Sequence, residues 1–536
     1  MKSLYYNGTI LTMADVQPQV EAVLVEDGRI SMVGKLCELE NFVAENEKID
    51  LKGGTLLPGF IDSHSHITMV AMSKLFANLT PENGVKNISS LLRTLQQYLD
   101  EADLDDDEWL IGMNYDDLAL EEKRHPTRFE LDQVSKEKPI VCVHVSSHIC
   151  SANSKALELY GYYDGCEEVP GGVIQRVPGS SVLNGVLEET AFQSVAFAKT
   201  GFPKPEKVVK ALLDAERYYA SQGYTTASEI SCLGNNVKIL KWMADQKQHI
   251  VDVMIHCLNL DDIENFGRQG EYTNHLRCNG AKIVLDGSPQ AETAWLTEPY
   301  YKVLDGKAED YCGYPSVSDE ALYQWIKRCV SQKWPIALHC NGDAAADQYL
   351  NIYEKVWREE GSPEDLRPVM IHCQTLRDDQ LDRMKALGMS ATFFIGHVYY
   401  WGDLHYEVTL GPTRAKRISP LKSAVDKGVN YTIHQDSPIT PPNQLLSIHT
   451  AVNRETKNGR VLGKDQSITV EEAFKAATIN AAYQHFEEAT KGSIEPGKIA
   501  DFVVLDKNPF EIDPSQIKEL KVVATIKEGN EIYVSE

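Results

Sequence analysis

The stretch Thr55-Leu-Leu-Pro-Gly-Phe-Ile-Asp-Ser-His-Ser-His66 is an apolar run that ends in two histidines one residue apart. Such a run is typical of a buried strand. Because side chains alternate across a strand, His64 and His66 point to the same face and can hold one metal ion together. Two histidines can also simply end a strand at a polar edge, so the rest of the chain has to decide between these interpretations.

The same pattern, an apolar strand ending in a side chain that can bind metal, recurs later in the chain. It is found in Trp334-Pro-Ile-Ala-Leu-His339, Pro368-Val-Met-Ile-His372 and Val429-Asn-Tyr-Thr-Ile-His-Gln-Asp436. Zinc favours imidazole nitrogen and carboxylate oxygen, and a catalytic zinc site keeps one position open for water. We therefore predict a site for a divalent metal ion and expect that ion to be zinc. The predicted ligands are His64, His66, His339, His372 and Asp436.

Eight strands alternate with helical patterns through the middle of the chain. The expected strands are 55–62, 224–230, 251–258, 281–285, 335–339, 369–372, 390–394 and 429–433. This alternation predicts an α/β fold, a parallel (β/α)8 TIM-like barrel, in which function lies at the carboxyl ends of the strands. The predicted ligands fall at those ends.

The two ends of the chain predict a second domain. Residues 1–54 and 490–536 contain short alternating strands, with hairpin turns at Glu26-Asp-Gly-Arg29 and Glu528-Gly-Asn530. Neither piece could bury a core alone, so we expect them to form one small β-sandwich beside a barrel at 55–489. The connection after the first barrel strand is far too long for a loop, which predicts an inserted subdomain at about 70–200.

The composition of the chain limits the classes of molecule that it can bind. The chain has 53 basic and 78 acidic residues, a net charge of -25, and no basic patch, which argues against nucleic acid. No apolar run reaches the roughly 20 residues of a membrane span. The start of the chain lacks the pattern of a signal peptide, which predicts a cytoplasmic protein. We expect a small-molecule substrate, and the sequence leaves open whether the chain is a homo-oligomer.

Together these motifs resemble the amidohydrolase superfamily, and within it the amidohydrolase-3, YtcJ-like branch. The motifs are the run that ends at His66, Lys282-Ile-Val-Leu-Asp-Gly-Ser288, His339-Cys-Asn-Gly-Asp343, His372-Cys-Gln374, Asp436-Ser-Pro438 and Gly492-Ser-Ile-Glu-Pro-Gly-Lys-Ile-Ala-Asp501. The chain departs from the family where Gln435, preceded by His434, replaces the usual serine before the aspartate. The resemblance implies a hydrolase of carbon-nitrogen bonds other than peptide bonds, such as amide, N-acyl or N-formyl bonds.

The residues predict a mechanism. A bound metal ion turns water into hydroxide at neutral pH and polarises a carbonyl oxygen. Asp436 would act as general base toward this water and then as general acid toward the leaving nitrogen. His372 is a ligand or, with a single metal ion, a contact to the substrate oxygen. His434 shares a strand face with Asp436, so it orients that carboxylate or is a structural histidine.

Lys282 has two interpretations. In the first, its ammonium group pairs with Asp286 on the same strand face, or extends to water at the end of the long side chain. Alternatively, a lysine kept neutral by burial reacts with carbon dioxide to give a carbamate, whose negative charge can bridge two metal ions. The resemblance to superfamily members with a fourth-strand lysine favours the carbamate and thus a site for two ions, whereas the first interpretation leaves one.

Substrate contacts are predicted from position and resemblance. His148, in Ser147-His-Ile-Cys-Ser-Ala-Asn-Ser154, matches a histidine of the family that faces substrate, although it could equally be satisfied within the insert; Glu189 matches a family glutamate with the same ambiguity. His397 and Trp295 follow strands whose ends face the site. Neighbouring aromatic residues, Phe393, Phe394, Tyr399, Tyr400 and Trp401, predict an apolar or aromatic group on the substrate, unless they pack in the core.

Two other functions share these features. A decarboxylase or isomerase on the same scaffold would keep every metal ligand and differ only in its substrate pocket. A noncatalytic regulatory or binding protein would be expected to lose ligands, and this chain retains the full set.

Overall fold

A computed structural model of the chain describes residues 2–102, 104–117, 119–145, 149–169, 172–189, 191–192, 203–266, 270–302, 308–363 and 365–535. The chain divides into two compact units. The first combines Met1–Thr68 with Leu213–Glu536, and the second is Met69–Leu212. All of the predicted metal ligands belong to the first unit: His64, His66, Lys282, His339, His372 and Asp436.

The first unit is built on an eight-stranded parallel sheet. In spatial order the strands are β8 (Phe60–Ile61), β15 (Tyr224–Cys232), β16 (Asp252–Cys257), β17 (Leu276–Val284), β18 (Ile336–Cys340), β19 (Val369–His372), β20 (Ser390–Phe393) and β21 (Asn430–Ile433). The sheet is curled, and its edges approach each other where His66 N donates to Ser437 O at 2.8 Å. The predicted α/β fold with eight parallel strands is confirmed.

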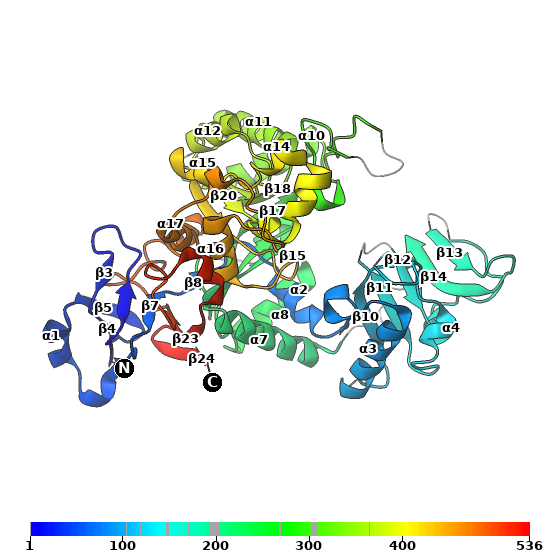
Figure 1. Cartoon of the computed structure of the whole chain (residues 1–536), viewed down its shortest axis with the longest axis horizontal. Helices are drawn as coiled ribbons and strands as arrows, with labels where there is room; N and C mark the ends of the chain where they lie inside the picture. The colour runs from blue at the N-terminus through cyan, green and yellow to red at the C-terminus, as the bar shows by residue number, and fades with distance from the viewer. Residues whose placement is uncertain are drawn as a thin grey trace. The chain divides into compact units, whose positions relative to one another are not determined.

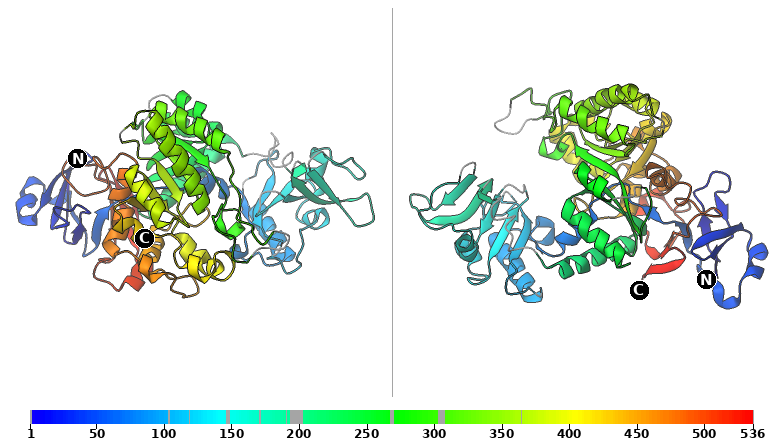
Figure 2. Two further views of the ribbon diagram at one scale, coloured as in Figure 1. Left: turned by 90° about the horizontal axis from the view of Figure 1, so that it is seen from above. Right: turned by 180° about the vertical axis from the view of Figure 1, so that it is seen from behind.

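Helices cover the outside of the curled sheet (Figures 1 and 2). They include α8 (Gly234–Asp245), α9 (Leu260–Phe266), α10 (Asp319–Ser331), α11 (Asp343–Glu359), α12 (Asp378–Ala386) and α15 (Leu421–Asp426). The amphipathic pattern of α10 buries Leu322, Ile326 and Cys329 on one face. Ser318 caps this helix, because its side chain accepts a hydrogen bond from Ala321 N.

The run expected as one first strand divides at Gly59. Residues Thr55–Pro58 form β7, which pairs with β22 (Phe502–Leu505), whereas only β8 pairs within the curled sheet. A Cβ atom at Gly59 would lie 2.4 Å from the Thr225 side chain, so only glycine fits where the chain passes from one sheet to the other. The histidine pair therefore follows a short strand that is anchored on both sides.

The two ends of the chain form two further sheets. One has the order β5-β4-β1-β6 and the other β24-β23-β22-β7-β2-β3. Their strands are β1 (Lys2–Tyr6), β2 (Thr9–Leu11), β3 (Gln19–Val20), β4 (Ala22–Glu26), β5 (Arg29–Gly34), β6 (Lys48–Asp50), β23 (Val522–Lys527) and β24 (Asn530–Val534). Both predicted hairpins are present, since Glu26 pairs with Arg29 and Lys527 with Asn530. The sheets share one apolar cluster that includes Tyr5, Leu56 and Phe502.

Buried ion pairs hold the C-terminal segment on the curled sheet. Lys527 Nζ lies 2.9 Å from both Asp252 and Asp501, and Lys491 contacts Asp252 and, at 3.0 Å, Glu487. These side chains are almost fully buried. Because removing one partner from such a pair typically destabilises by about 3–5 kcal/mol, the cluster fixes the C-terminal segment against the start of β16.

The second unit has its own six-stranded sheet with the order β13-β14-β12-β11-β10-β9. The strands are β9 (Ala77–Asn78), β10 (Leu110–Tyr115), β11 (Ile140–His144), β12 (Ile149–Ala152), β13 (Gly172–Arg176) and β14 (Leu183–Glu189). Helix α3 (Ile88–Glu101) buries Leu91 and Leu95 in an apolar cluster with this sheet. Helix α5 (Ser154–Leu159) begins after Asn153, whose side chain caps it by accepting a hydrogen bond from Ala156 N.

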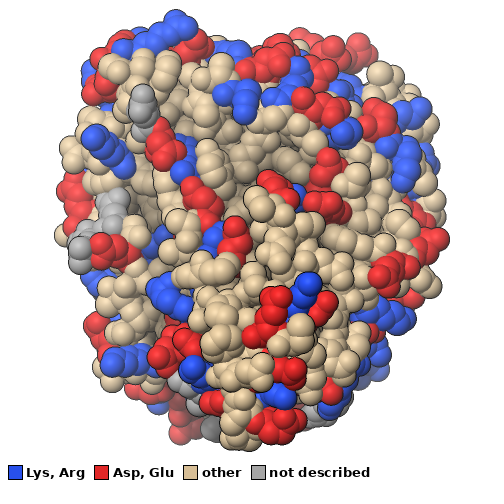
Figure 3. Space-filling model, turned by 90° about the vertical axis from the view of Figure 1, so that its left-hand side faces the viewer, with Lys and Arg blue, Asp and Glu red and all other residues tan. Residues whose placement is uncertain are grey.

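Two surface properties complete the description. None of the helices in the described ranges is long and apolar enough to span a membrane. On the face shown in Figure 3, acidic and basic side chains are interspersed, and no large patch of one sign forms there.

Candidate metal centre

Asp62 shapes the turn that presents the two histidines. Its Oδ1 atom accepts a hydrogen bond from His64 N at 3.3 Å, and its Oδ2 atom accepts from Ser228 N at 3.1 Å and from the Ser65 hydroxyl. His66 is tied to β15 by a bridge with Glu229. These contacts fix His64 and His66 at the carboxyl end of β8. The sequence analysis did not single out Asp62, although its position two residues before His64 is a signal for this role.

Asp436 meets both histidines from the other edge of the sheet. It follows β21 with a φ of 56°, a left-handed conformation that is uncommon outside glycine. Its Oδ1 atom lies 3.0 Å from His64 Nε2 and 3.4 Å from His66 Nε2. Two ligands of a tetrahedral zinc ion, each about 2.0–2.1 Å from it, are themselves about 3.3 Å apart. The three atoms therefore have the spacing of metal ligands.

The bonding state of these atoms agrees with this interpretation. Among the described residues, Asp436 Oδ1 is buried and not aligned for a hydrogen bond with any donor. Although burial disfavours a charged carboxylate, the imidazoles of His64 and His66 hold the pKa of Asp436 well below its usual range. Burial also holds the pKa of His64 well below its usual range. The ionised carboxylate and the neutral imidazole of His64 are the forms that bind metal, whereas Asp436, against the effect of burial, raises the pKa of His66, so His66 has to lose a proton when it binds an ion.

A second group of ligand-type atoms adjoins the first. One nitrogen each of His64, His372 and His434 lies within 4.8 Å of the others. His372 ends β19 with a φ of 74°, another strained conformation at a strand end. Burial holds the pKa of His372 well below its usual range and lowers that of His434 to about 3, so all three imidazoles are neutral. His64 belongs to both groups, which places them side by side.

His339 lies next to these groups and belongs to neither. Its ring centroid is 4.4 Å from that of His372, and its Nδ1 atom is 3.1 Å from Asp286 Oδ1. Asp286 also accepts hydrogen bonds from three backbone N–H groups, those of Trp295, Asn341 and Gly342. A carboxylate in this position orients an imidazole and leaves its other nitrogen toward the site. The sequence had suggested Asp286 only as a partner for Lys282.

Lys282 is enclosed by the curled sheet. Only 2% of its surface is exposed, and no ion pair involves it in the part of the chain that the structure describes. Neither pairing with Asp286 nor exposure to water is therefore found. Burial lowers the pKa of the ammonium group to about 7, even though the carboxylate of Asp436 favours its charged form. A large fraction of this lysine is a neutral amine at physiological pH.

An aromatic wall stands on one side of the imidazoles. The Phe394 ring lies 5.1 Å from His434 and 4.8 Å from His397, measured between centroids. His397 is buried on α13 (Gly396–Leu404), where its Nδ1 atom is 3.0 Å from His405 Nε2. His405 begins a π-helical turn, a rare element that often marks functional sites. His405 was overlooked in the sequence, although its spacing of two helical turns from His397 was a signal.

Of the other residues predicted to contact substrate, only Trp295 is fully described by the structure. Trp295 is half-buried, and its backbone is held between Asp286 and Ala344 at the carboxyl end of the sheet. His148 lies outside the described residues, and the side chain of Glu189 is likewise not described.

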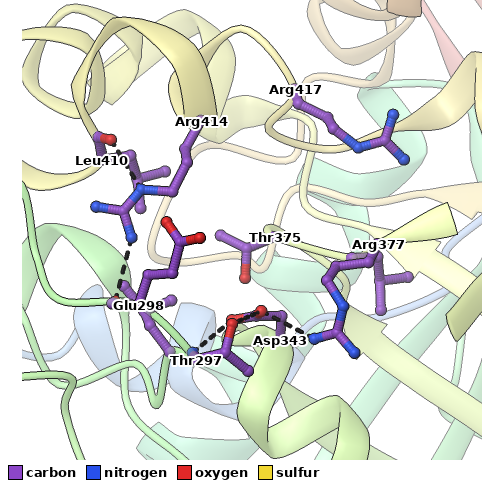
Figure 4. A pocket seen from close by; sticks show the side chains of 10 residues that line it. Thr297, Glu298, Asp343, Thr375, Arg377, Leu410, Arg414 and Arg417 are labelled. Carbon is purple, nitrogen blue, oxygen red and sulfur yellow. Dashed lines mark hydrogen bonds and ion pairs between the residues drawn. The ribbon is translucent and has the colours of Figure 1, made fainter. Parts of the chain in front are cut away.

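A cavity of about 170 Å³ opens beside this end of the sheet (Figure 4). Three arginines line it, and each is already engaged: Arg377 with Asp343 at 3.0 Å, Arg414 with three backbone carbonyls, and Arg417 with Asp378. The guanidinium groups therefore tie together the loops that follow β17 to β20.

Comparison with known proteins places the chain in a family. A sequence model described as the amidohydrolase family matches residues 47–533. The chain belongs to the amidohydrolase family. This confirms the resemblance drawn from the motifs, and family membership makes the protein a hydrolase.

Full-length relatives of this amidohydrolase are known. It is 27% identical to the N-substituted formamide deformylase of Arthrobacter pascens, over 98% of this chain and 96% of the relative. It is also 27% identical to the YtcJ protein of Bacillus subtilis, over 99% of both chains. A crystal structure titled as an uncharacterized metal-dependent hydrolase from Pyrococcus horikoshii shares its fold, with a TM-score of 0.79, 24% identity, and coverage of 96% and 99%.

Proposed function

We propose that this amidohydrolase is a metal-dependent enzyme that hydrolyses a carbon-nitrogen bond outside peptides, of the amide, N-acyl or N-formyl type. The observation that carries the proposal is the convergence of Asp436 Oδ1 with the Nε2 atoms of His64 and His66, at 3.0 and 3.4 Å. The name of the Arthrobacter pascens relative, a deformylase of N-substituted formamides, supports the N-formyl class. The curled sheet would be the (β/α)8 barrel of the family, and the terminal sheets its β-sandwich.

The residues present fit a divalent cation, with zinc as first choice. His64, His66, His372 and Asp436 supply imidazole nitrogen and an ionised carboxylate oxygen, and Asp436 Oδ1 has no donor aligned with it. His339, oriented by Asp286, and Lys282 would extend the site to a second ion. When bound, the cation would lower the pKa of water toward ~7 and polarise a carbonyl oxygen.

Asp436 is the residue that we assign to proton transfer. Its pKa lies well below the usual range, so at neutral pH the carboxylate is ionised, which is the form that a general base needs. It would take this proton from the attacking water as the new carbon-oxygen bond forms. It would return the proton to the nitrogen as the carbon-nitrogen bond breaks, which gives an acid and an amine.

We infer that the substrate carries an apolar or aromatic group. The Phe394 ring contacts His372 and His434 directly, so a bound molecule would meet this wall beside the ligands. His397, braced by His405, would contact the substrate, with Trp295 on the neighbouring loop. The same role for His148 rests on the motif alone.

A screen of N-formyl and N-acyl amines tests the proposed function. We expect release of the free amine from at least one aromatic member, lost after chelation and restored by zinc. Release of carbon dioxide, or rearrangement without uptake of water, would instead assign the decarboxylase or isomerase alternative and overturn the hydrolase proposal.

Lys282 gives a separate prediction. If its neutral amine adds carbon dioxide, losing one proton, the resulting carbamate would supply an anionic ligand for a second ion, and Lys282→Ala should lower the metal content from about two ions per chain to one or none. Acetate should partly restore activity by supplying a carboxylate in place of the carbamate. Because the amine has a pKa of about 7, metal loading in bicarbonate should increase as pH rises through that value, where the neutral form takes over.

Metal analysis of Lys282→Ala beside Lys427→Ala gives the control. Lys427 pairs with Asp382 at the surface, so its loss should leave the metal content unchanged. An unchanged metal content in Lys282→Ala would rule out the carbamate.

A further inference from the structure

The imidazole of His434 lies inside the metal centre without a function in the scheme above. Its side chain is fully buried, and neither ring nitrogen is aligned for a hydrogen bond in the described part of the chain. A neutral imidazole always carries one N–H donor and one acceptor nitrogen. A buried imidazole whose two nitrogens make no hydrogen bond destabilises the folded protein, so native structures rarely contain one. The ring therefore needs a partner that is not one of these residues.

The neighbours of His434 show what that partner is. Its ring centroid lies 4.8 Å from that of His64 and 5.2 Å from that of His372, and the His64 and His372 centroids are also 5.2 Å apart. Two imidazoles bound to one tetrahedral zinc ion have centroids about 5 Å apart. His64 and His66, which share Asp436, are separated by the same 5.2 Å. The three rings thus surround one point at the spacing of a common ion.

His339 is the alternative third imidazole, and its contacts differ. Its Nδ1 atom faces Asp286, and its Nε2 atom lies 3.3 Å from the amide nitrogen of Asn341. It is absent from the group of nitrogens within 4.8 Å. Phe394 packs on another side of His434 with a centroid separation of 5.1 Å, whereas the imidazoles of His64 and His372 lie 4.8 and 5.2 Å away.

We propose that His434 is a ligand of the metal ion, which His64, His372 and His434 would hold as an all-imidazole set beside His66 and Asp436. This inference rests on the proposed metal centre and deepens it. A third neutral nitrogen donor raises affinity for zinc, cobalt and copper relative to magnesium or manganese, which prefer oxygen. His434 thus adjusts the choice of metal in addition to holding it.

The sharpest test places a spectroscopic reporter at position 434. In the cobalt-loaded His434→Cys protein, a thiolate bound to the ion gives a sulfur-to-cobalt charge-transfer band in the near ultraviolet, which an unbound thiol does not give. Thr432→Cys is the matched control, because Thr432 is buried two residues earlier on the same strand face. Cobalt-loaded wild type, which contains eleven native cysteines, supplies the background. We expect the band in His434→Cys alone.

Zinc affinity gives a second measurement that does not depend on the cysteine variant. His434→Gln should raise the zinc Kd by on the order of 10³-fold in equilibrium dialysis, more than the 10–100-fold range typical of residues that only orient ligands. A zinc Kd that rises by less than about 100-fold, together with the absence of a charge-transfer band in His434→Cys, would overturn the assignment of His434. If wild type itself bound no zinc or cobalt, the metal centre of the proposed function would fail as well, so the two failures are distinguishable.

Discussion

Replacing His64 with alanine should empty the metal centre. His64 is the residue that both groups of ligand-type atoms share, so its loss removes a donor from each. We expect less than about a tenth of an equivalent of metal per chain, since a ligand set missing its common member holds metal poorly. Turnover should fall by about 10³-fold or more, because a bound metal supplies several kcal/mol of transition-state stabilisation.

The control for this variant is His256→Ala. His256 is buried on β16, yet it belongs to neither group of ligand-type atoms. Its truncation should leave the metal content near that of wild type, which shows that loss of a buried imidazole does not by itself expel metal. Circular dichroism should report a folded protein for His64→Ala. Wild-type metal content in a folded His64→Ala protein would refute the proposed ligand set.

Asp436→Asn is expected to produce the second largest loss. An asparagine keeps the shape of the side chain and an oxygen that can face the ion, but it cannot accept the proton of water. Turnover should decrease by on the order of 10²-fold or more, the usual contribution of general acid-base catalysis. Metal should remain bound, so a fall in kcat with retained metal separates the loss of proton transfer from the loss of a ligand.

The surface variant Asp261→Asn controls for the exchange of a carboxylate for an amide. Asp261 pairs with Arg328 at the surface, is largely exposed and belongs to neither group of ligand-type atoms, so its substitution should leave kcat unchanged. A rate close to wild type for Asp436→Asn would remove Asp436 from proton transfer and require another base.

The sequence was sufficient for the order of the strands and the histidine pair, because both depend on local patterns. Strand 369–372 matches β19 at both ends, and the expected strand 429–433 matches β21 within one residue. The division of the first strand at Gly59 was not predictable, because β7 is defined by pairing with Phe502–Leu505, more than four hundred residues away.

The site could be predicted only in part for the same reason. Alternation placed His434 and Asp436 on one strand face, but what His434 meets depends on His64 and His372, which come from other strands. Likewise, the spacing of Lys282 and Asp286 suggested an ion pair, whereas the loops after β17 and β18 bring three backbone N–H groups and His339 to Asp286 instead. Long-range contacts of this kind leave no local signal in the sequence.

We propose that a divalent ion held by these residues enables the hydrolysis of a carbon-nitrogen bond. This dependence on metal can be measured by titrating zinc into the chelated wild-type enzyme while following the release of amine from a responsive N-formyl or N-acyl compound. We expect activity to be negligible without metal, to rise in proportion to bound zinc, and to saturate at about one or two ions per chain. Full activity in the chelated enzyme, or zinc binding without any gain in amine release, would contradict this proposal.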